Sequence, residues 1–473
     1  MRGALALVLH AHMPYVEGFG TWPFGEEWLW EAIACVYLPL LGLIEESPLT
    51  VGLTPVLCDQ LERLPGEAGT RLRAYLQDVK APLHAEDARQ LDHAAAAEVA
   101  RAARDYSAAE QALEAIGGDL LGAYRRAADD GPAELVTSAA THAVLPLLAT
   151  RAGLRLQLAT GIRSHERRFG AFSGGFWLPE CAYEPGLERD LGEHGVRSFV
   201  VDQTVALGLG ALDQLEPVTT PAGPVAVPLD WETISLVWSN ESGYPAHSLY
   251  RDYHRGTAGG THPWRNDGGG YRHADALAQA RRDAGDFVRR AIARLDRYAT
   301  ERRRPGLLCC PLDAELLGHW WYEGPAWLAA VVEEARERGL ELVTLSEGVA
   351  RAQPVERALV ASSWGRGGDL SSWDSPATAE LVFAARGAEL RTVAAARPGA
   401  ELAPAARELL ALQSSDWAFM VTRRLAGTYP HERFGGHARA LDDALDQVAL
   451  DQTTHSRLRN LAPDLELAAL QGR

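Results

Sequence analysis

Short, uninterrupted apolar runs recur along the first three quarters of the chain and constrain its fold more than any other feature. Each run has the length of one strand, and a run without polar alternation is typical of a strand buried on both faces of a parallel sheet. Helical segments with apolar residues three and four apart, such as residues 280–299, lie between the runs. This alternation predicts an α/β fold, and about seven such units favour a barrel over an open sheet. The expected strands are residues 4–10, 50–57, 134–140, 174–180, 198–202, 306–313 and 341–347.

The segments between and after these runs predict how the chain is divided. Residues from about 58 to 130 are rich in Ala, Arg and Asp, and we expect them to be helices inserted into the barrel or lying over it. The Gly-rich stretch 256–270 predicts a loop near the mouth of the site. Past residue 357 the strand pattern stops and helical patterns come to dominate. We therefore expect a barrel over residues 1–357 and a helical domain over residues 358–473.

Charge and aromatic content bear on the partner. The net charge of -17 and the sequence pI near 5.4 argue against nucleic acid, because binding a polyphosphate requires a basic surface. The chain contains 13 Trp, and flat aromatic faces stack well on sugar rings. Burial in the core is the alternative explanation for these residues. A neutral carbohydrate polymer is thus compatible with the composition. Nothing in the sequence indicates an oligomeric state.

Cysteine usage and hydropathy predict the compartment. Five cysteines without paired CxxC spacing fit free thiols in a reducing cytoplasm. The opening MRGALALVLHAHMPY is expected to be a strand, because His10 and His12 interrupt its apolar run and no small-residue cleavage site follows. No apolar stretch is expected to reach the roughly 20 residues that cross a bilayer. The prediction is a cytoplasmic protein without a membrane partner.

Polar residues fall at the ends of the expected strands, where a parallel barrel carries its active site. His10, Glu180, Asp202 and Asp313 each end an apolar run. Cleaving a glycosidic bond needs two carboxyls, one to attack or activate water and one to protonate the leaving oxygen. Glu180 and Asp313 are the best pair, because nearby aromatic residues would partly desolvate both acids. From spacing alone, either carboxyl could instead cap a helix.

Seven segments spread over the chain carry recognisable motifs. They are HAHMPYV (10–16), ATHAVLPLL (140–148), GFWLPECAYEPGLE (175–188), VWSNESGYP (237–245), PLDAELLGHWWYEGP (311–325), SSWGRGGDLSSW (362–373) and QSSDWAFM (413–420). In this order they resemble the conserved regions of glycoside hydrolase family 57, in particular its 1,4-α-glucan branching enzymes. The resemblance covers nearly the whole chain.

The resemblance implies an incomplete (β/α)7 barrel followed by an α-helical domain that completes the substrate cleft. It also implies a retaining double displacement on an α-glucan polymer, with no metal and no cofactor. By its place in WLPE, Glu180 corresponds to the nucleophile. By its place in PLDAELLGHWW, Asp313 corresponds to the general acid/base.

The resemblance further implies the residues that bind the sugar. His10, His12 and His142 correspond to histidines beside the nucleophile; a metal site is the alternative, which the family pattern does not require. Asp416 corresponds to a position facing the cleft, or it caps the helix that follows. The other residues implied to line the cleft, part of them expected to be packing, are Trp22, Trp28, Tyr244, His319, Trp320, Trp364, Trp373 and Trp417.

The acceptor of the transferred chain separates the possible activities. A glucose 6-hydroxyl gives a branch, whereas water gives hydrolysis, so branching requires that water be excluded. Branching enzymes of this family carry a shielding tyrosine in the loop before VWS, and here residues 207–239 contain none. The missing tyrosine fits raised hydrolysis, but the segments around Asp313 and in the C-terminal domain look most like the branching enzymes, so the resemblance favours a branching enzyme. An α-amylase or 4-α-glucanotransferase, and a non-catalytic glucan-binding protein, are the alternatives.

Overall fold

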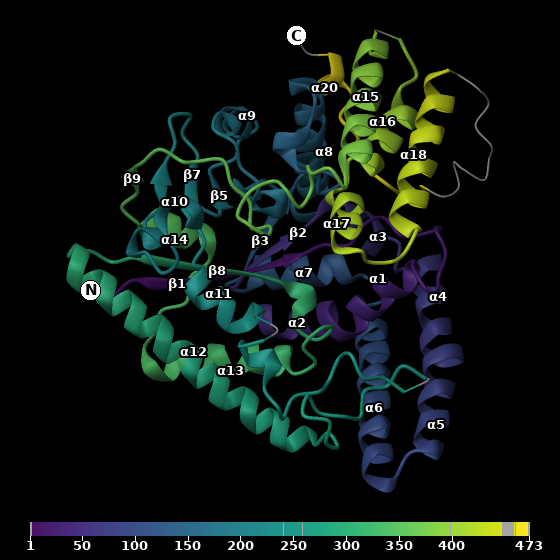
Figure 1. Cartoon of the computed structure of the whole chain (residues 1–473), viewed down its shortest axis with the longest axis vertical. Helices are drawn as coiled ribbons and strands as arrows, with labels where there is room; N and C mark the ends of the chain where they lie inside the picture. Colours follow the sequence, from purple (N-terminus) through teal and green to yellow (C-terminus); the bar gives the residue numbers. More distant parts are fainter. Residues whose placement is uncertain are drawn as a thin grey trace.

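The computed structural model describes residues 2–239, 241–257, 259–397, 399–446, 458 and 460–471. At its centre lies a sheet of nine strands in the order β8-β1-β2-β3-β4-β5-β7-β6-β9 (Figure 1). The first seven strands in this order are parallel to their neighbours. They are β8 (Leu307–Asp313), β1 (Ala4–Ala11), β2 (Thr50–Leu53), β3 (Glu134–Ser138), β4 (Gly175–Trp177), β5 (Ser198–Val201) and β7 (Val225–Pro228).

The seven parallel strands curl into an incomplete barrel. Two residues beyond β7, the Asp230 amide donates to the Cys309 carbonyl of β8 over 3.0 Å, so the two ends of the parallel series meet. Two short strands extend the sheet beyond β7: β6 (Val218–Thr219) pairs antiparallel with β7, and β9 (Val355–Glu356) pairs parallel with β6. The prediction of an incomplete (β/α)7 barrel is confirmed.

The expected strand at residues 341–347 is wrong, and a cap explains why. Leu342 makes only an isolated bridge to Leu5, and α14 (Leu345–Arg351) follows directly. The Thr344 hydroxyl accepts the Glu347 amide at 3.2 Å, as the first residue of a Thr-x-x-Glu capping box does. The seventh parallel strand is instead β7, whose Pro-flanked sequence was not expected to form one.

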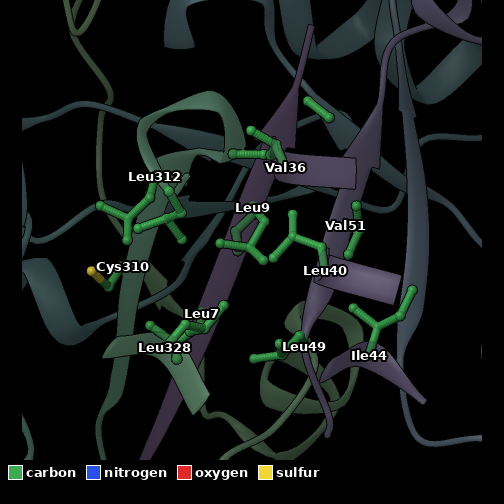
Figure 2. Packing of buried hydrophobic residues seen from close by; sticks show 14 of the residues in the cluster. Leu7, Leu9, Val36, Leu40, Ile44, Leu49, Val51, Cys310, Leu312 and Leu328 are labelled. Atoms are coloured by element: carbon green, nitrogen blue, oxygen red, sulfur yellow. The ribbon is translucent and has the colours of Figure 1, made fainter. Parts of the chain in front are cut away.

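An N-terminal helical run packs against the strands of the barrel and forms part of the main hydrophobic core. This run consists of α1 (Glu26–Ala32), η1 (Ile33–Tyr37) and α2 (Leu38–Ile44). Its apolar side chains pack on those of β1, β2 and β8, and each buried side chain contributes roughly 1.5–3 kcal/mol. Figure 2 shows Leu7, Leu9, Val51 and Leu312 of the strands with Val36, Leu40 and Ile44 of the helices.

The same helical run is more apolar than expected, because no apolar stretch was expected to approach the length that crosses a bilayer. Residues Glu26–Ile44 form a stretch of 19 residues that is long and apolar enough, by length and composition, to cross a membrane. However, 56% of its most apolar window is buried inside the structure. The core helices of globular proteins often have the same length and apolar composition, and the buried side chains of this stretch belong to the core of the barrel.

Helices from the insertion lie to one side of the barrel. They are α3 (Pro55–Leu61), α4 (Glu67–Ala74), η2 (Tyr75–Lys80), α5 (Ala81–Gln90), α6 (His93–Ala115) and α7 (Leu120–Asp130). Helices α5 and α6 project from the body as an antiparallel pair (Figure 1). The loop that includes residues 256–270 is tied to this pair, because Thr261 donates to Asp87 of α5 at 2.7 Å.

The other connections of the barrel are mostly helical. They are α8 (Arg151–Phe169), α9 (Leu187–Glu193), α10 (Thr204–Leu207), α11 (Trp231–Trp238), α12 (His273–Arg302) and α13 (Gly324–Arg338), with the short turns η3 (Leu145–Leu147), η4 (Pro179–Cys181), η5 (Leu212–Leu215), η6 (Tyr244–Ala246) and η7 (Ala314–Leu316). The long α12 packs against α13 along the side of the barrel away from the C-terminal helices (Figure 1).

The C-terminal part is helical and shares a core with the barrel. It consists of α15 (Ala379–Ala395), α16 (Ala403–Leu412), α17 (Ser415–Arg423), α18 (Tyr429–Leu445) and α20 (Ala468–Gln471). Leu409 and Trp417 of these helices belong to one buried cluster with Tyr15 and Leu156 of the barrel. The helices therefore dock firmly on the carboxyl ends of the strands, and α17 begins at the site described next.

Candidate active site

Two carboxyl groups lie at the carboxyl ends of separate strands. Asp313 is the last residue of β8 and pairs with His10 of β1. Glu180 lies in the turn after β4, with a φ of 61°, which is unusual for a residue with a side chain. Such backbone strain costs about 1–3 kcal/mol and clusters at functional sites. The turn directs Glu180 into the site where a continued strand would have directed it elsewhere.

Each oxygen of the Glu180 carboxyl accepts one hydrogen bond. Ser415 of α17 donates to Oε1 at 2.8 Å, and the Trp364 indole donates to Oε2 at 3.0 Å. Burial raises the pKa of Glu180, while the two donors oppose this rise by stabilising the charged form. A carboxylate held between two donors is oriented for attack. Of the two acids, Glu180 is the one equipped to carry the negative charge.

Asp313 lies in surroundings that favour its protonated form. Burial raises the pKa of Asp313 well above its ordinary value, and the negative charges of Glu315 and Glu180 raise it further. A carboxylic acid that stays protonated near neutrality can donate its proton to a leaving oxygen. The charge of Glu180 acts on Asp313, as expected of two carboxyls at the same end of the barrel. Their environments assign them different roles.

Four rings form a sharply bent column beside Glu180, in which the ring centroids of His10 and His12 are also only 6.1 Å apart. Trp177 stacks on His10 with ring centroids 4.5 Å apart, His10 on His142 at 4.8 Å, and His142 on His12 at 4.1 Å. At the end of the column, His12 Nε2 lies 2.9 Å from Asp416 Oδ2 of α17, and its Nδ1 lies 3.1 Å from the Thr54 hydroxyl. The column connects β1, β3 and β4 to the C-terminal helices.

The column carries its positive charge at one end. Burial lowers the pKa of His12, but the carboxylates of Asp416, Glu315 and Glu180 together more than offset this, so the pKa of His12 is raised overall. Burial lowers the pKa of His10 and of His142 well below the ordinary value, and the charge of His12 lowers both further. The two inner rings are therefore neutral. Four buried nitrogens here have no partner in the structure, namely His10 Nδ1 and Nε2, His142 Nε2 and Trp177 Nε1.

Unpaired buried nitrogens indicate a polar ligand. Leaving one such group unsatisfied costs about 1–3 kcal/mol, so sites of this kind are normally completed by water or by substrate. A sugar, with several hydroxyls that both donate and accept, suits neutral imidazoles. The described residues include no group of three or more His, Cys, Asp or Glu placed to hold a metal ion.

Glu315 is a half-buried carboxyl that sequence reasoning missed. Its Oε1 accepts the Tyr37 hydroxyl at 2.6 Å and the His12 amide at 3.1 Å. Burial raises the pKa of Glu315, and these donors oppose the rise. Its position two residues after Asp313 was the available signal, since the turn η7 brings both carboxyls to the same end of β8. Glu315 therefore contributes negative charge next to the acid.

We expect Glu315→Gln to move the alkaline limb of the activity profile to lower pH by about one unit. Removing the negative charge lowers the pKa of Asp313, so the acid loses its proton sooner as the pH rises. The amide oxygen of Gln can still accept the Tyr37 hydroxyl. The measurement is kcat/KM against pH, with Glu341→Gln as a control because Glu341 is exposed. An unmoved alkaline limb would show that Glu315 carries no charge in the working enzyme.

The structure brings most of the predicted residues to this site. Trp364 contacts both Glu180 and the ring column, since its indole packs edge-on against Trp177 at 5.0 Å. Asp416 lies within α17 and pairs with His12, which supports the cleft-facing interpretation over the helix cap. Ser415 was not predicted, although it directly precedes Asp416. Its only signal was that position, because serine in SSDW also suits a helix start.

Other predicted residues lie elsewhere. Trp373 and Trp417 are each only 1% exposed, so the prediction that they bind substrate is corrected: both rings pack in the core beside the C-terminal helices. The Tyr244 hydroxyl donates to Asp286 of α12 at 2.9 Å, and Asp202 accepts the Trp231 indole at 2.6 Å. Both side chains thus have structural partners.

The remaining aromatic residues form two groups outside the ring column. Trp320 is 50% exposed and packs with His319 around Tyr253, whose ring lies 4.6 Å from that of Trp320. Trp28 packs on Tyr429, and Trp22 nearby in sequence is 76% exposed. The exposed rings can stack on a sugar chain, whereas Trp28 mainly joins the barrel to α18.

A parallel barrel with one carboxyl held by two hydrogen-bond donors, a second carboxyl whose pKa is raised well above its ordinary value, and buried polar nitrogens without partners defines a glycoside-cleaving enzyme. The family model described as glycosyl hydrolase family 57 matches residues 6–361, and the one described as 1,4-alpha-glucan branching enzyme, C-terminal, matches residues 387–467. The chain belongs to glycosyl hydrolase family 57.

The chain is also similar to proteins that are named as branching enzymes. A 1,4-alpha-glucan branching enzyme from Thermococcus kodakarensis is 32% identical over 93% of this chain and 73% of its own length. A probable 1,4-alpha-glucan branching enzyme from Mycobacterium tuberculosis is 33% identical over 96% of this chain and 94% of its own. The crystal structure of a family 57 branching enzyme from Pyrococcus horikoshii superposes with a TM-score of 0.92 at 30% identity, covering 99% and 97% of the two chains.

Proposed function

We propose that this chain is a 1,4-α-glucan branching enzyme that works by retaining double displacement. The observation that carries the proposal is the difference between Glu180, whose carboxyl accepts from two hydrogen-bond donors, and Asp313, whose pKa is raised by burial and by the negative charges of Glu315 and Glu180. The branching-enzyme C-terminal match over residues 387–467 supports branching among the activities of the family, because these residues include the helices that complete the site.

The first half of the reaction cleaves the chain. Glu180 attacks the anomeric carbon of an α-1,4-linked glucose, and the bond to the leaving oxygen breaks as that oxygen takes the proton of Asp313. This step leaves a covalent glycosyl-enzyme and an ionised Asp313. The charged His12 and the neutral His10 and His142 are placed to bind the hydroxyls of the sugar beside the nucleophile.

The second half decides the product. Asp313, now a base, removes the proton from a glucose 6-hydroxyl, which attacks the anomeric carbon and releases Glu180. Water in the same position gives hydrolysis. Residues 207–239 contain no tyrosine, so any shielding by this stretch needs another residue. Trp238 is a candidate, because it stacks on Trp364 with ring centroids 6.3 Å apart.

We expect the protein to lower the iodine colour of amylose while few reducing ends appear. The anomeric carbon released by cleavage passes to Glu180 and then to a glucose 6-hydroxyl, so branching leaves the number of reducing ends unchanged. Treatment with an α-1,6-specific debranching enzyme is then expected to release short linear chains. Glu180→Gln provides the inactive control. Reducing ends that rise in step with the loss of colour would instead assign the protein as an α-amylase.

We further propose that the enzyme acts in the cytoplasm on a glycogen-like polymer, without nucleic acid or membrane partners. The five cysteines support this, because the structure has each of them as a free thiol, as expected in a reducing compartment. The acidic net charge also disfavours polyphosphate partners. Cell fractionation and the branch content of glycogen in a deletion strain test this proposal.

A further inference from the structure

Ser415 links the nucleophile to the ring column. Its hydroxyl lies 2.8 Å from Glu180 Oε1 and 2.9 Å from His142 Nδ1, and the side chain is almost completely buried. Main-chain contacts fix this arrangement, because the Ser415 amide donates to the His142 carbonyl at 3.2 Å and Ser414 bridges to Ala143. The hydroxyl is therefore held between a carboxyl and an imidazole by a rigid junction of α17 with the segment after β3.

With Glu180 ionised, as the proposed nucleophile has to be, one assignment of protons satisfies these contacts. A hydroxyl has a single proton, and an ionised carboxylate can only accept, so Ser415 must donate to Glu180. The hydroxyl oxygen then has to accept from His142, which places a proton on Nδ1. Because His142 is neutral, its Nε2 carries none. Nε2 is one of the buried nitrogens without a partner, and as a bare acceptor it lies ready for a donor.

We propose that Ser415 is a positioning residue of the C-terminal helical domain, which orients the Glu180 carboxylate and fixes His142 as the Nδ1–H tautomer, so that Nε2 accepts a hydroxyl of the sugar. The proposal rests on the proposed function, in which Glu180 is the nucleophile. It gives the helical domain a part in the chemistry of the barrel: docking of α17 completes the nucleophile's hydrogen bonds. A barrel without α17 would have a carboxylate with one donor and a histidine of undefined tautomer.

The histidine tautomer is measured directly by long-range 1H–15N correlation NMR on protein labelled with 15N-histidine. His142→Gln identifies the signal. We expect a protonated Nδ1 and an unprotonated Nε2 in the wild type, and a shift of the proton to Nε2 in Ser415→Ala. A wild-type His142 protonated at Nε2 overturns the proposal. This readout needs no catalysis, so it decides the proposal even if the protein proves inactive on every α-glucan, which would refute only the proposed function.

The kinetic test uses Ser415→Ala with two companions. Loss of a hydrogen bond to a charged group is expected to lower kcat by about 10- to 100-fold. It also raises the pKa of Glu180, so the acidic limb of the pH profile moves to higher pH. The titratable groups that face Glu180 are Asp416 and His12, whose charges act on it, the neutral His142, whose Nδ1 lies 3.7 Å from Glu180 Oε1, and Asp313, on which the charge of Glu180 acts.

The companion variants separate positioning from a merely structural effect. Ser415→Thr keeps the hydroxyl and is expected to restore the acidic limb and most of the rate. Thr422→Val, on the same helix, removes a hydroxyl that bonds only the Ser372 carbonyl in the structure, at 2.7 Å, and should leave both unchanged. If Ser415→Ala leaves the acidic limb in place, or if Thr does not restore it, Ser415 is not a positioning residue.

Discussion

Replacing Glu180 by Gln is expected to reduce glucan transfer by at least about 10⁴-fold. The amide cannot form the covalent intermediate. Its NH2 group must also face either the Trp364 indole or the Ser415 hydroxyl, and in the wild type each of these donates a hydrogen bond to the carboxylate. The fold should persist, because the change is isosteric. The measurement is the initial rate on amylose, with circular dichroism to verify folding.

A matched control and a chemical rescue make this result specific. Glu184→Gln, four residues away and exposed, should keep full activity. Glu180→Ala opens space for a small anion, so azide is expected to restore turnover of an activated glycosyl fluoride and to give a product of inverted anomeric configuration. Rescue with retained configuration, or activity above one hundredth of wild type in Glu180→Gln, would remove Glu180 from the role of nucleophile.

Replacing Asp313 by Asn is expected to cost about 10²- to 10⁴-fold on amylose, the usual contribution of a general acid. The loss should depend on the leaving group. Cleavage of a natural glycosidic bond needs the proton of Asp313, whereas loss of fluoride does not, so a glycosyl fluoride should still form the intermediate at nearly the normal rate. Its breakdown then lacks the base, and the glycosyl-enzyme should accumulate.

Intact-protein mass spectrometry would detect that accumulation as an added glycosyl mass. The alkaline limb of the pH profile should also vanish, because burial and its neighbours hold the pKa of Asp313 well above its ordinary value and the Asn side chain does not titrate. Asp296→Asn is the control, since Asp296 pairs with Arg2 on a partly exposed surface where an ion pair contributes little. Equal losses on amylose and on the fluoride would contradict the acid role.

The carboxyl pair could be anticipated from the sequence because both acids end continuous apolar runs. Strands buried on both faces have continuous apolar sequences, so the expected bounds of β1, β4 and β8 agree with the structure to within a few residues. The parallel arrangement then required their carboxyl ends to meet. The strand expected at 341–347 failed for a local reason, since the cap at Thr344 outweighed the apolar pattern. The short β7 was missed because it has little pattern to detect.

The sequence by itself determined the α/β alternation and the helical end of the chain, because hydrophobic periodicity is a property of neighbouring residues, and motif order supplied Glu180 and Asp313 as candidate acids with their expected roles. Only the tertiary structure decided which groups surround each acid, that Trp373 and Trp417 are buried in the core, and that Ser415 donates to Glu180. These outcomes depend on burial and on contacts between Glu180 and a helix more than 200 residues away. Such contacts exist only once α17 docks on the barrel, so they cannot be predicted from the local sequence around either residue.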